Sequence, residues 1–174
     1  MTRIAWDEVG VRRFETGIDR GVFYPSSGDG VPWNGLISVD LKQDGVSSSP
    51  VYFDDKKIND IIYLGDLSAS VRALTYPDEF LPYDGFVECA DGLFIDGQDR
   101  GVFDLAYRSL IGDDVDGLNL GYKIHLLYNL TAIPEDVTNQ SIDSNIAPIE
   151  FGWTFTSVPG EIPGFRPSSH IVDD

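Results

Sequence analysis

The sequence has little of the side-chain chemistry on which most enzymes depend. Its 174 residues include one cysteine, Cys89, and two histidines, His125 and His170. One cysteine excludes an intramolecular disulfide and a cysteine metal cluster. No Gly-x-Ser-x-Gly nucleophile motif accompanies the histidines, so a hydrolase triad is not expected, and His125 is predicted to be an ordinary sheet residue. These absences predict a protein that is not an enzyme and that uses no cofactor or metal.

Long hydrophobic runs and positive charge are also scarce. No apolar run approaches the roughly 20 residues that a membrane helix needs, and residues 1–8 lack the apolar core of a signal peptide, so neither a membrane span nor export by that route is expected. Twelve basic residues against 29 acidic ones give a formal charge of −17. This balance argues against a sequence-reading nucleic-acid binder, which presents positive patches to phosphate, but it fits a surface that repels DNA.

Three motif-like stretches do not carry their usual chemistry. The segment Gly28-Asp29-Gly30 lacks the lysine and helix of a nucleotide-binding loop. The acidic stretch from Asp113 lacks the glutamate that an EF-hand has at its twelfth position, which here is Ile124, so a solvated turn is the better interpretation. Carboxylate pairs suited to a glycosidase can be chosen freely from 29 acids, and their number alone supports that alternative.

Glycine and proline are abundant instead, and they separate short apolar runs. Eighteen glycines and ten prolines are spread over the whole length, which predicts a single mainly β domain, a sandwich or partial barrel over residues 1–174. Apolar and polar residues alternate in four segments, 36–42, 103–108, 122–129 and 151–156. The second and third of these predict a hairpin. A further strand is expected over 67–76, stopped by Pro77, and another near His170.

Four segments lie outside the expected strands. Residues 1–16 are interpreted as an N-terminal arm, residues 43–50 and 113–120 as long loops, and residues 159–174 as a C-terminal segment interrupted by prolines. Loops of this length are often functional, and the loop at 43–50 is expected to reach a neighbouring subunit. Residues 61–64 are compatible with a short strand or with one helical turn.

Several short motifs, taken in order, resemble one family. They are residues 6–10 (WDEVG), 13–17 (RFETG), 31–36 (VPWNGL), 74–80 (LTYPDEF), 106–114 (AYRSLIGDD), 121–128 (GYKIHLLY) and 151–155 (FGWTF). In order and approximate spacing they resemble the major tail proteins, or tail tube proteins, of long-tailed bacteriophages, over most of the chain. The resemblance implies a tail-tube-like β-sandwich or partial barrel with one short helix and long loops.

The resemblance also implies an assembly. Six copies would form a ring, and rings would stack into a hollow tube through which DNA passes without specific binding, with long loops locking successive rings. Other tail proteins, such as the tape measure and the tail terminator, would be partners. The protein would belong to the virion tail, would be assembled in the host cytoplasm, and would have no membrane partner.

Two sets of residues are candidates for roles in such a tube. Acidic residues on or beside the expected strands are candidates for an acidic lumen that repels phosphate: Asp19, Asp40, Asp54, Asp55 and Asp66. Candidates for contacts between subunits or rings are Arg72, Tyr76, Phe80, Ser47, Asp114 and Asp116. The alternative from another class is a carbohydrate-binding β-sandwich, in which Trp6, Trp33, Trp153 and the eight tyrosines would supply stacking faces.

Overall fold

A computed structural model describes residues 6–63, 65–141 and 148–174, so the first five residues of the expected arm and Leu64 lie outside the described residues. The chain is mainly β with one short helix, as expected from the sequence. The elements in order are β1 (Phe14–Pro25), β2 (Val31–Trp33), β3 (Leu36–Asp44), β4 (Ser47–Phe53), β5 (Lys56–Tyr63), β6 (Asp66–Ala73), the 3-10 turn η1 (Asp78–Phe80), α1 (Leu81–Asp84), β7 (Val87–Ala90), β8 (Leu93–Ile95), β9 (Phe103–Asp113), β10 (Gly117–Pro134), β11 (Phe151–Ser157) and β12 (His170–Asp173). Within the described ranges no helix is long and apolar enough to cross a bilayer.

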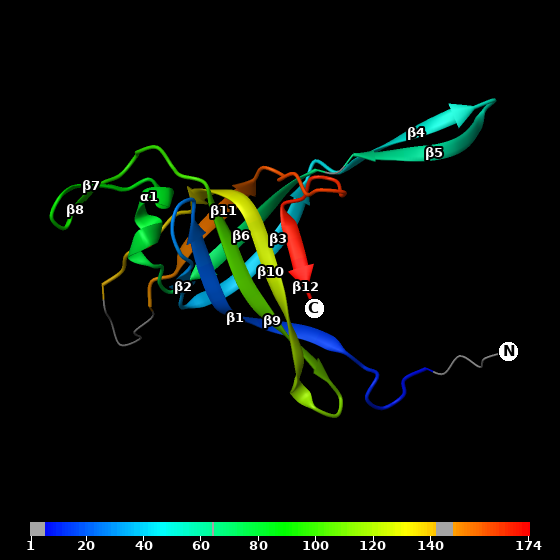
Figure 1. The fold of residues 1–174 in the computed structure, drawn as a ribbon, viewed down its shortest axis with the longest axis horizontal. Helices are drawn as coiled ribbons and strands as arrows, with labels where there is room; N and C mark the ends of the chain where they lie inside the picture. Colours follow the sequence, from blue (N-terminus) through cyan, green and yellow to red (C-terminus); the bar gives the residue numbers. More distant parts are fainter. Residues whose placement is uncertain (1–5, 64, 142–147) are drawn as a thin grey trace.

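Eight strands form one antiparallel sheet in the order β2-β1-β9-β10-β11-β6-β3, with β12 added beside β10 (Figure 1). The hairpin expected between β9 and β10 is confirmed by their pairing, and so is the strand at His170, which pairs with Leu127. Strands β2 and β3 stand at the two ends of this order and are not paired with each other. The sheet is therefore open and is not a closed barrel.

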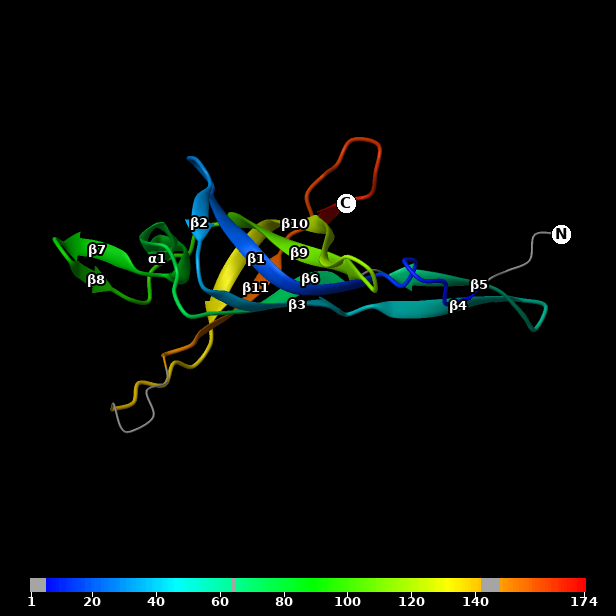
Figure 2. The same cartoon turned by 90° about the horizontal axis from the view of Figure 1, so that it is seen from below.

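Strand β10 belongs to both halves of the sheet. On one side β10 pairs with β9 from Gly117 to Leu130, and on the other side it pairs first with β12, up to Leu127, and then with β11 from Leu130 onward. Between Leu127 and Leu130 the register shifts at a bulge where Asn129 has a positive φ of 52°. Bulges bend a strand and increase its twist, and Figure 2 shows β1 and β9 passing over β11, β6 and β3. The sheet therefore folds over itself as a sandwich.

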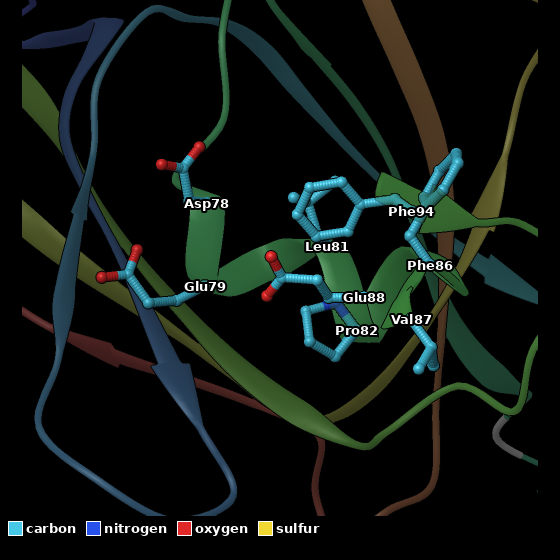
Figure 3. A pocket seen from close by; sticks show the side chains of 8 residues that line it. All are labelled: Asp78, Glu79, Leu81, Pro82, Phe86, Val87, Glu88 and Phe94. Carbon is cyan, nitrogen blue, oxygen red and sulfur yellow. The ribbon is translucent and has the colours of Figure 1, made fainter. Parts of the chain in front are cut away.

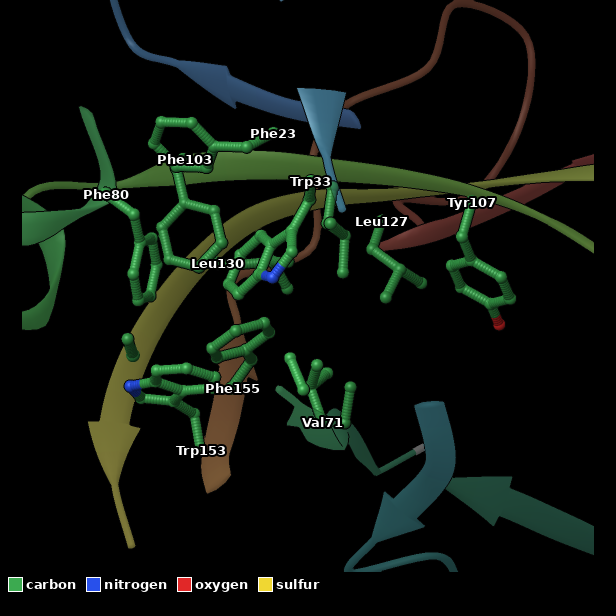
Figure 4. Close-up of a cluster of buried hydrophobic side chains, with 14 residues drawn as sticks. Phe23, Trp33, Val71, Phe80, Phe103, Tyr107, Leu127, Leu130, Trp153 and Phe155 are labelled. Atoms are coloured by element: carbon green, nitrogen blue, oxygen red, sulfur yellow. The ribbon is translucent and has the colours of Figure 1, made fainter. Parts of the chain in front are cut away.

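The core lies between these two layers and consists largely of aromatic rings (Figure 4). The alternation of β11 turns Trp153 and Phe155 inward, and η1 contributes Phe80, which is fully buried. The ring of Phe103, from the opposite layer, meets Phe155 edge to face at 5.0 Å and Phe80 at 5.4 Å. Edge-to-face pairs of this kind add to the stabilisation from burial. This cluster fills the space between the two layers, which β10 also connects through its pairing with β9 and β11.

The turn after β6 is held by the same cluster. The expected strand over 67–76 is too long: β6 ends at Ala73, because Leu74 N–H donates to the carbonyl of Gly35 at 2.8 Å and leaves the ladder. The indole of Trp33 then donates to the carbonyl of Thr75 at 2.9 Å. The short helix α1 ends at Asp84 and is capped by Gly85, whose φ of 94° is a conformation that glycine adopts without strain.

Two small hairpins project from opposite ends of the sandwich, β4–β5 at one end and β7–β8 beside α1 at the other (Figures 1 and 2). The prediction of a long loop over 43–50 is wrong, since β3 continues to Asp44 and β4 begins at Ser47. Ser47 to Pro50 pair with β5, so this serine-rich segment forms a ladder. The open alternative at residues 61–64 is resolved as strand up to Tyr63.

The other boundaries also differ from the prediction. Instead of a long loop over 113–120, β9 reaches Asp113 and β10 begins at Gly117. The Asp113 carboxylate accepts the N–H groups of Val115 at 2.9 Å and Asp116 at 2.6 Å, so a side chain closes a tight turn. At the N-terminus, β1 begins at Phe14, which leaves residues 6–13 as the described part of the arm.

Candidate assembly surfaces

The outer face of β3, β6 and β11 is polar. Asp40 lies opposite Ser70 on this face, and Asp66 lies opposite Asp44 at the end of the same ladder. The Glu135 carboxylate lies across β6 and β11 and accepts hydrogen bonds from Thr154 at 3.1 Å and from Ser70 at 3.4 Å. The face carries five carboxylates and two cations: Asp40, Asp44, Asp66, Glu135 and Glu150, with Lys42 and Arg72. We name it the acidic face.

Asp40 and Asp66 are the only two predicted lumen residues that the structure brings to this face. Asp19 lies in β1, in the other layer, where its carboxylate accepts two hydrogen bonds from the Arg108 guanidinium at 2.6 and 2.5 Å. These bonds hold the pKa of Asp19 below its usual range and offset its charge. Asp54 and Asp55 form the turn at the tip of β4–β5. The five acids therefore do not line one wall of a single subunit.

The β4–β5 hairpin exposes most of its apolar side chains. Tyr52 is 61% exposed, Phe53 67%, Ile58 63% and Ile62 60%. At the tip, Tyr52 lies opposite Lys57 and Phe53 opposite Lys56. The turn residues Asp54 and Asp55 both have positive φ, 48° and 61°, as the tightest hairpin turns require. A two-stranded hairpin is marginally stable alone in water, and no second layer covers this one within the described chain.

Several predicted contact residues are used inside the chain. Arg72 lies 3.9 Å from Glu135 and 4.0 Å from Glu150. Asp114 accepts the N–H of Gly10 at 2.8 Å and lies 3.9 Å from Arg12, so it fastens the N-terminal arm to the β9–β10 turn.

The remaining contact candidates lie in different environments. Phe80 is fully buried, so its prediction as a subunit contact is wrong and its role is in the core. Tyr76 is half-buried and packs against Phe151 at 5.1 Å between ring centroids. Ser47 and Asp116 are exposed.

A groove opens between the helical turns and the β7–β8 hairpin (Figure 3). The groove is open to solvent and has a volume of about 630 Å³, within the range of ligand pockets. Its apolar wall consists of Leu81, Pro82, Phe86, Val87 and Phe94, and its acidic residues are Asp78, Glu79 and Glu88. In the view of Figure 3, Asp78 and Glu79 stand on the opposite side from Phe86 and Phe94. The mixed aromatic and polar pattern of 86–95 gave no sequence signal for this groove.

A polar cluster links β1, β9, β10 and β12 inside the sandwich. The Ser109 hydroxyl donates to Glu15 at 2.6 Å and lies 2.9 Å from Nε2 of His125, whose Nδ1 lies 3.1 Å from Nε2 of His170. The His125 ring stacks on Tyr107 at 4.7 Å between centroids, so His125 is a packed sheet residue. Ser109 is only 5% exposed, which keeps its hydroxyl from reaching a substrate in solution.

Charge and burial shift several pKa values in this cluster. Hydrogen bonds from Lys123, at 2.8 Å, and from Ser109 lower the pKa of Glu15 to about 2. Burial lowers the pKa of His170, and the neighbouring His125 adds to this effect. Burial raises the pKa of Tyr107 to about 12. Among the residues that the structure describes, no group of three or more His, Cys, Asp or Glu side chains is arranged to hold a metal.

The indoles proposed for carbohydrate stacking are differently placed. Trp33 and Trp153 are each 2% exposed and belong to the core, whereas Trp6 in the arm is 82% exposed. Tyr122 is 51% exposed and its ring faces outward, with the Arg108 guanidinium 4.9 Å from its centroid. Stacking on a sugar needs an accessible ring face, so two of the three tryptophans are excluded from that role.

No protein-family model matches the sequence, and no curated protein matches it. Among solved structures, the chain is similar to two components of an extracellular contractile injection system. In the PVC sheath-tube complex in the extended state, the similar chain is 13% identical, with a TM-score of 0.40 over 95% of this chain and 91% of that one. In the PVC sheath/tube terminator in the extended state, the values are 14%, 0.38, 99% and 100%.

Proposed function

We propose that the chain is a structural subunit of a phage-tail-like tube, in which six copies form a ring and rings stack into a tube. The observation that carries this proposal is the β4–β5 hairpin, which projects from the sandwich and contributes no residue to the buried aromatic core. Tyr52 and Phe53 at its tip are more than half exposed. Several large apolar side chains exposed on one small element mark an interaction site. The hairpin therefore serves contacts between copies, which is the role expected of the segment that begins with Ser47.

The open edges of the main sheet support the same proposal. Strand β3 is nine residues long and ends the sheet on one side, and β2 ends it on the other. An unpaired edge presents a row of backbone donors and acceptors that pairs readily with another chain. In a ring, edges of neighbouring subunits come together, and closure removes the exposed rows.

We assign the acidic face to the lumen. Asp40 and Asp66 lie there together with Glu135 and Glu150, and their carboxylates would repel the phosphates of passing DNA. Asp19 is directed to the other layer and is paired with Arg108, so it is not part of this wall. In this role the protein acts without catalysis or cofactor, in the tail of a virion assembled in the host cytoplasm. Its partners are copies of itself and other tail proteins such as the tape measure and tail terminator.

The first test is the assembly state of the purified protein. We expect sedimentation velocity to show concentration-dependent association, and negative-stain microscopy to show rings or tubes on the order of 100 Å across, the size expected from closing many strands into one barrel. The matched control is the variant Tyr52→Ser/Phe53→Ser/Ile58→Ser, which changes only exposed side chains of the hairpin. It should melt like the wild type but remain monomeric. A wild-type chain that stays monomeric at every accessible concentration would contradict the proposal.

The lumen assignment has its own test. Asp40→Lys/Asp66→Lys replaces two negative charges on the acidic face by positive ones, which should create salt-dependent DNA binding in assembled tubes. Asp91→Lys/Asp99→Lys makes the same change in charge at exposed positions beside β8. Electrophoretic mobility of short duplex DNA distinguishes the two variants. Equal binding by both would remove the assignment while leaving the tube proposal in place.

A further inference from the structure

An exposed aromatic side chain stands at the end of a braced loop. Phe165 is 80% exposed, and the exposed Arg166 follows it directly. The loop is closed at its base by two backbone hydrogen bonds between Gly160 and Ser168, at 3.1 and 3.0 Å, and a third bond, Phe165 N–H to the Ile162 carbonyl at 3.0 Å, forms its inner turn. We name residues 160–168 the anchor loop.

The anchor loop is restrained as well as closed. Pro163 and Pro167 fix two of its φ angles, and Gly164 supplies the positive φ of 83° that the turn requires. Restraint lowers the entropy that a bound loop would lose. An aromatic residue beside an arginine, on a restrained backbone and exposed to solvent, has the composition of an interface hot spot. Phe165 and Arg166 therefore form a preorganised docking element.

The groove beside α1 has the complementary character. Its wall offers an apolar surface to a ring, and Asp78, Glu79 and Glu88 place three carboxylates around it. The anchor loop and the groove lie well apart in both views of the molecule, so one chain cannot join them to each other (Figures 1 and 2). We infer that the groove of one copy receives Phe165 of a second copy, with Arg166 placed at the groove's carboxylates. This inference rests on the proposed self-assembly and names one of its contacts.

Charge selects the anchor loop over the hairpin as the occupant. At the tip of β4–β5 the turn residues Asp54 and Asp55 are followed by Lys56 and Lys57, so the tip offers no net positive charge to the three carboxylates of the groove. Asp54 and Asp55 form the outermost turn of that tip, and like charges placed together across an interface are unfavourable. In the anchor loop the charge beside the ring is positive, and Glu161 lies next to the loop base.

The contact would be heterologous, since two different surfaces of the same chain meet. Heterologous contacts repeat from copy to copy and generate either a closed ring or an open filament. The inference therefore places the anchor loop and the groove in the repeating contact of the assembly.

The experiment compares full-length variants by sedimentation velocity over a concentration series. We expect Phe165→Ala to raise the concentration for half-assembly by about thirtyfold, as for loss of a hot-spot side chain. Arg166→Glu should raise it by about tenfold or more, because it sets a carboxylate against three others. Glu88→Arg should weaken assembly similarly, and the double variant Arg166→Glu/Glu88→Arg should recover most of the lost association. Glu161→Arg in the same loop and Asp99→Arg outside the groove are the matched controls, expected to be close to wild type.

The outcomes separate this inference from the proposed function. Melting temperatures equal to that of the wild type establish that each variant is folded, which is expected at these exposed positions. If the wild type assembles and Phe165→Ala and Arg166→Glu assemble equally well, only the inference fails. The inference is also overturned if Arg166→Glu and Glu88→Arg each weaken assembly but the double variant does not recover it. The two charges would then act at different contacts. If the wild type does not assemble, the proposed function fails and this contact fails with it.

Discussion

The aromatic core and the β4–β5 hairpin are built from similar strands but end in opposite environments. Phe155 in β11 is fully buried, whereas Phe53 in β4 is 67% exposed. Both belong to antiparallel strands, but β11 faces a second layer that brings Phe103 to its ring, and the hairpin pairs only with itself. The comparison shows that the apolar face of a strand is stabilised when a second layer of protein buries it. The covering layer can come from the same chain or, as proposed for the hairpin, from another copy.

The largest effect on stability is expected at the centre of the core. Phe80→Ala removes a fully buried ring that contacts Trp33, Phe103 and Trp153. Loss of its transfer free energy and the cavity left behind should lower the free energy of unfolding by about 3–5 kcal/mol. Urea denaturation of the monomer measures this. Phe80→Leu, which keeps most of the apolar contact, should cost clearly less, and equal costs would show that the ring is not tightly packed.

A smaller effect is expected where the core meets the helix. The Asp84 side chain is 7% exposed and accepts the indole N–H of Trp153 at 2.9 Å. Asp84→Ala leaves this buried donor without its partner and should cost about 1–3 kcal/mol. Asp84→Asn keeps an acceptor oxygen and should cost less.

The sign of the pH dependence at Asp84 is a separate check. Burial raises the pKa of this carboxyl, so the folded chain holds the proton to higher pH than the unfolded chain does. The Asp84 contribution to stability therefore falls as pH rises through the acidic range from its unfolded pKa toward the folded one. Asp84→Asn should remove this component from a plot of unfolding free energy against pH. An unchanged plot would contradict the assigned role of burial.

A third effect concerns the polar cluster and should be smaller than the loss in Asp84→Ala. The lowered pKa of His170 means that the folded state favours the neutral ring, so stability is lost as pH falls below the unfolded value of about 6.5. Glu15, with a pKa of about 2, contributes in a different window, where stability is lost as pH falls from about 4.5 toward 2. Melting temperatures between pH 7.5 and 5.5 should decline less in His170→Gln than in the wild type. A parallel decline would assign the pH dependence to other groups.

The smallest effect on the stability of the monomer is expected at the hairpin. This effect tests most directly whether the hairpin, unlike the core, is left uncovered by its own chain. Phe53→Ser changes an exposed side chain outside the core, so the free energy of unfolding should change by no more than about 0.5 kcal/mol. In the same variant, association measured by sedimentation should be strongly weakened. A cost close to that of Phe80→Ala would show that the hairpin is supported by its own chain.

The sequence predicts the fold class and those strands that bury one face in the core, because alternation of apolar and polar residues follows directly from burial of one face. Trp153 and Phe155 alternate with Gly152 and Thr154, and the structure buries the two aromatic residues. The serine-rich segment from Ser47 was missed, since a ladder that packs against nothing has no apolar alternation to reveal it. Around Asp113 the sequence predicts a long loop, because the bonds that close the tight turn come from a side chain and leave no periodic pattern.

The candidate site was harder to predict than the fold. Asp40 and Asp66 were correctly placed on or beside strands, but only the register of β3 with β6 shows that they share a face. The anchor loop gave a signal only as a proline-rich break, and the groove depends on how β7–β8 folds back beside α1. Both arise from tertiary placement, which local pattern does not encode.

The bulge at Asn129 has a mechanical consequence. Its backbone N–H donates to Asp104 at 2.8 Å and its side-chain amide to the Val158 carbonyl at 3.1 Å, so the bend in β10 is fixed from both sides. Because one unbroken strand passes through this bend, the two layers share covalent backbone as well as packed rings. The bend in β10 therefore sets how the two layers are placed on each other, independently of the rings packed between them.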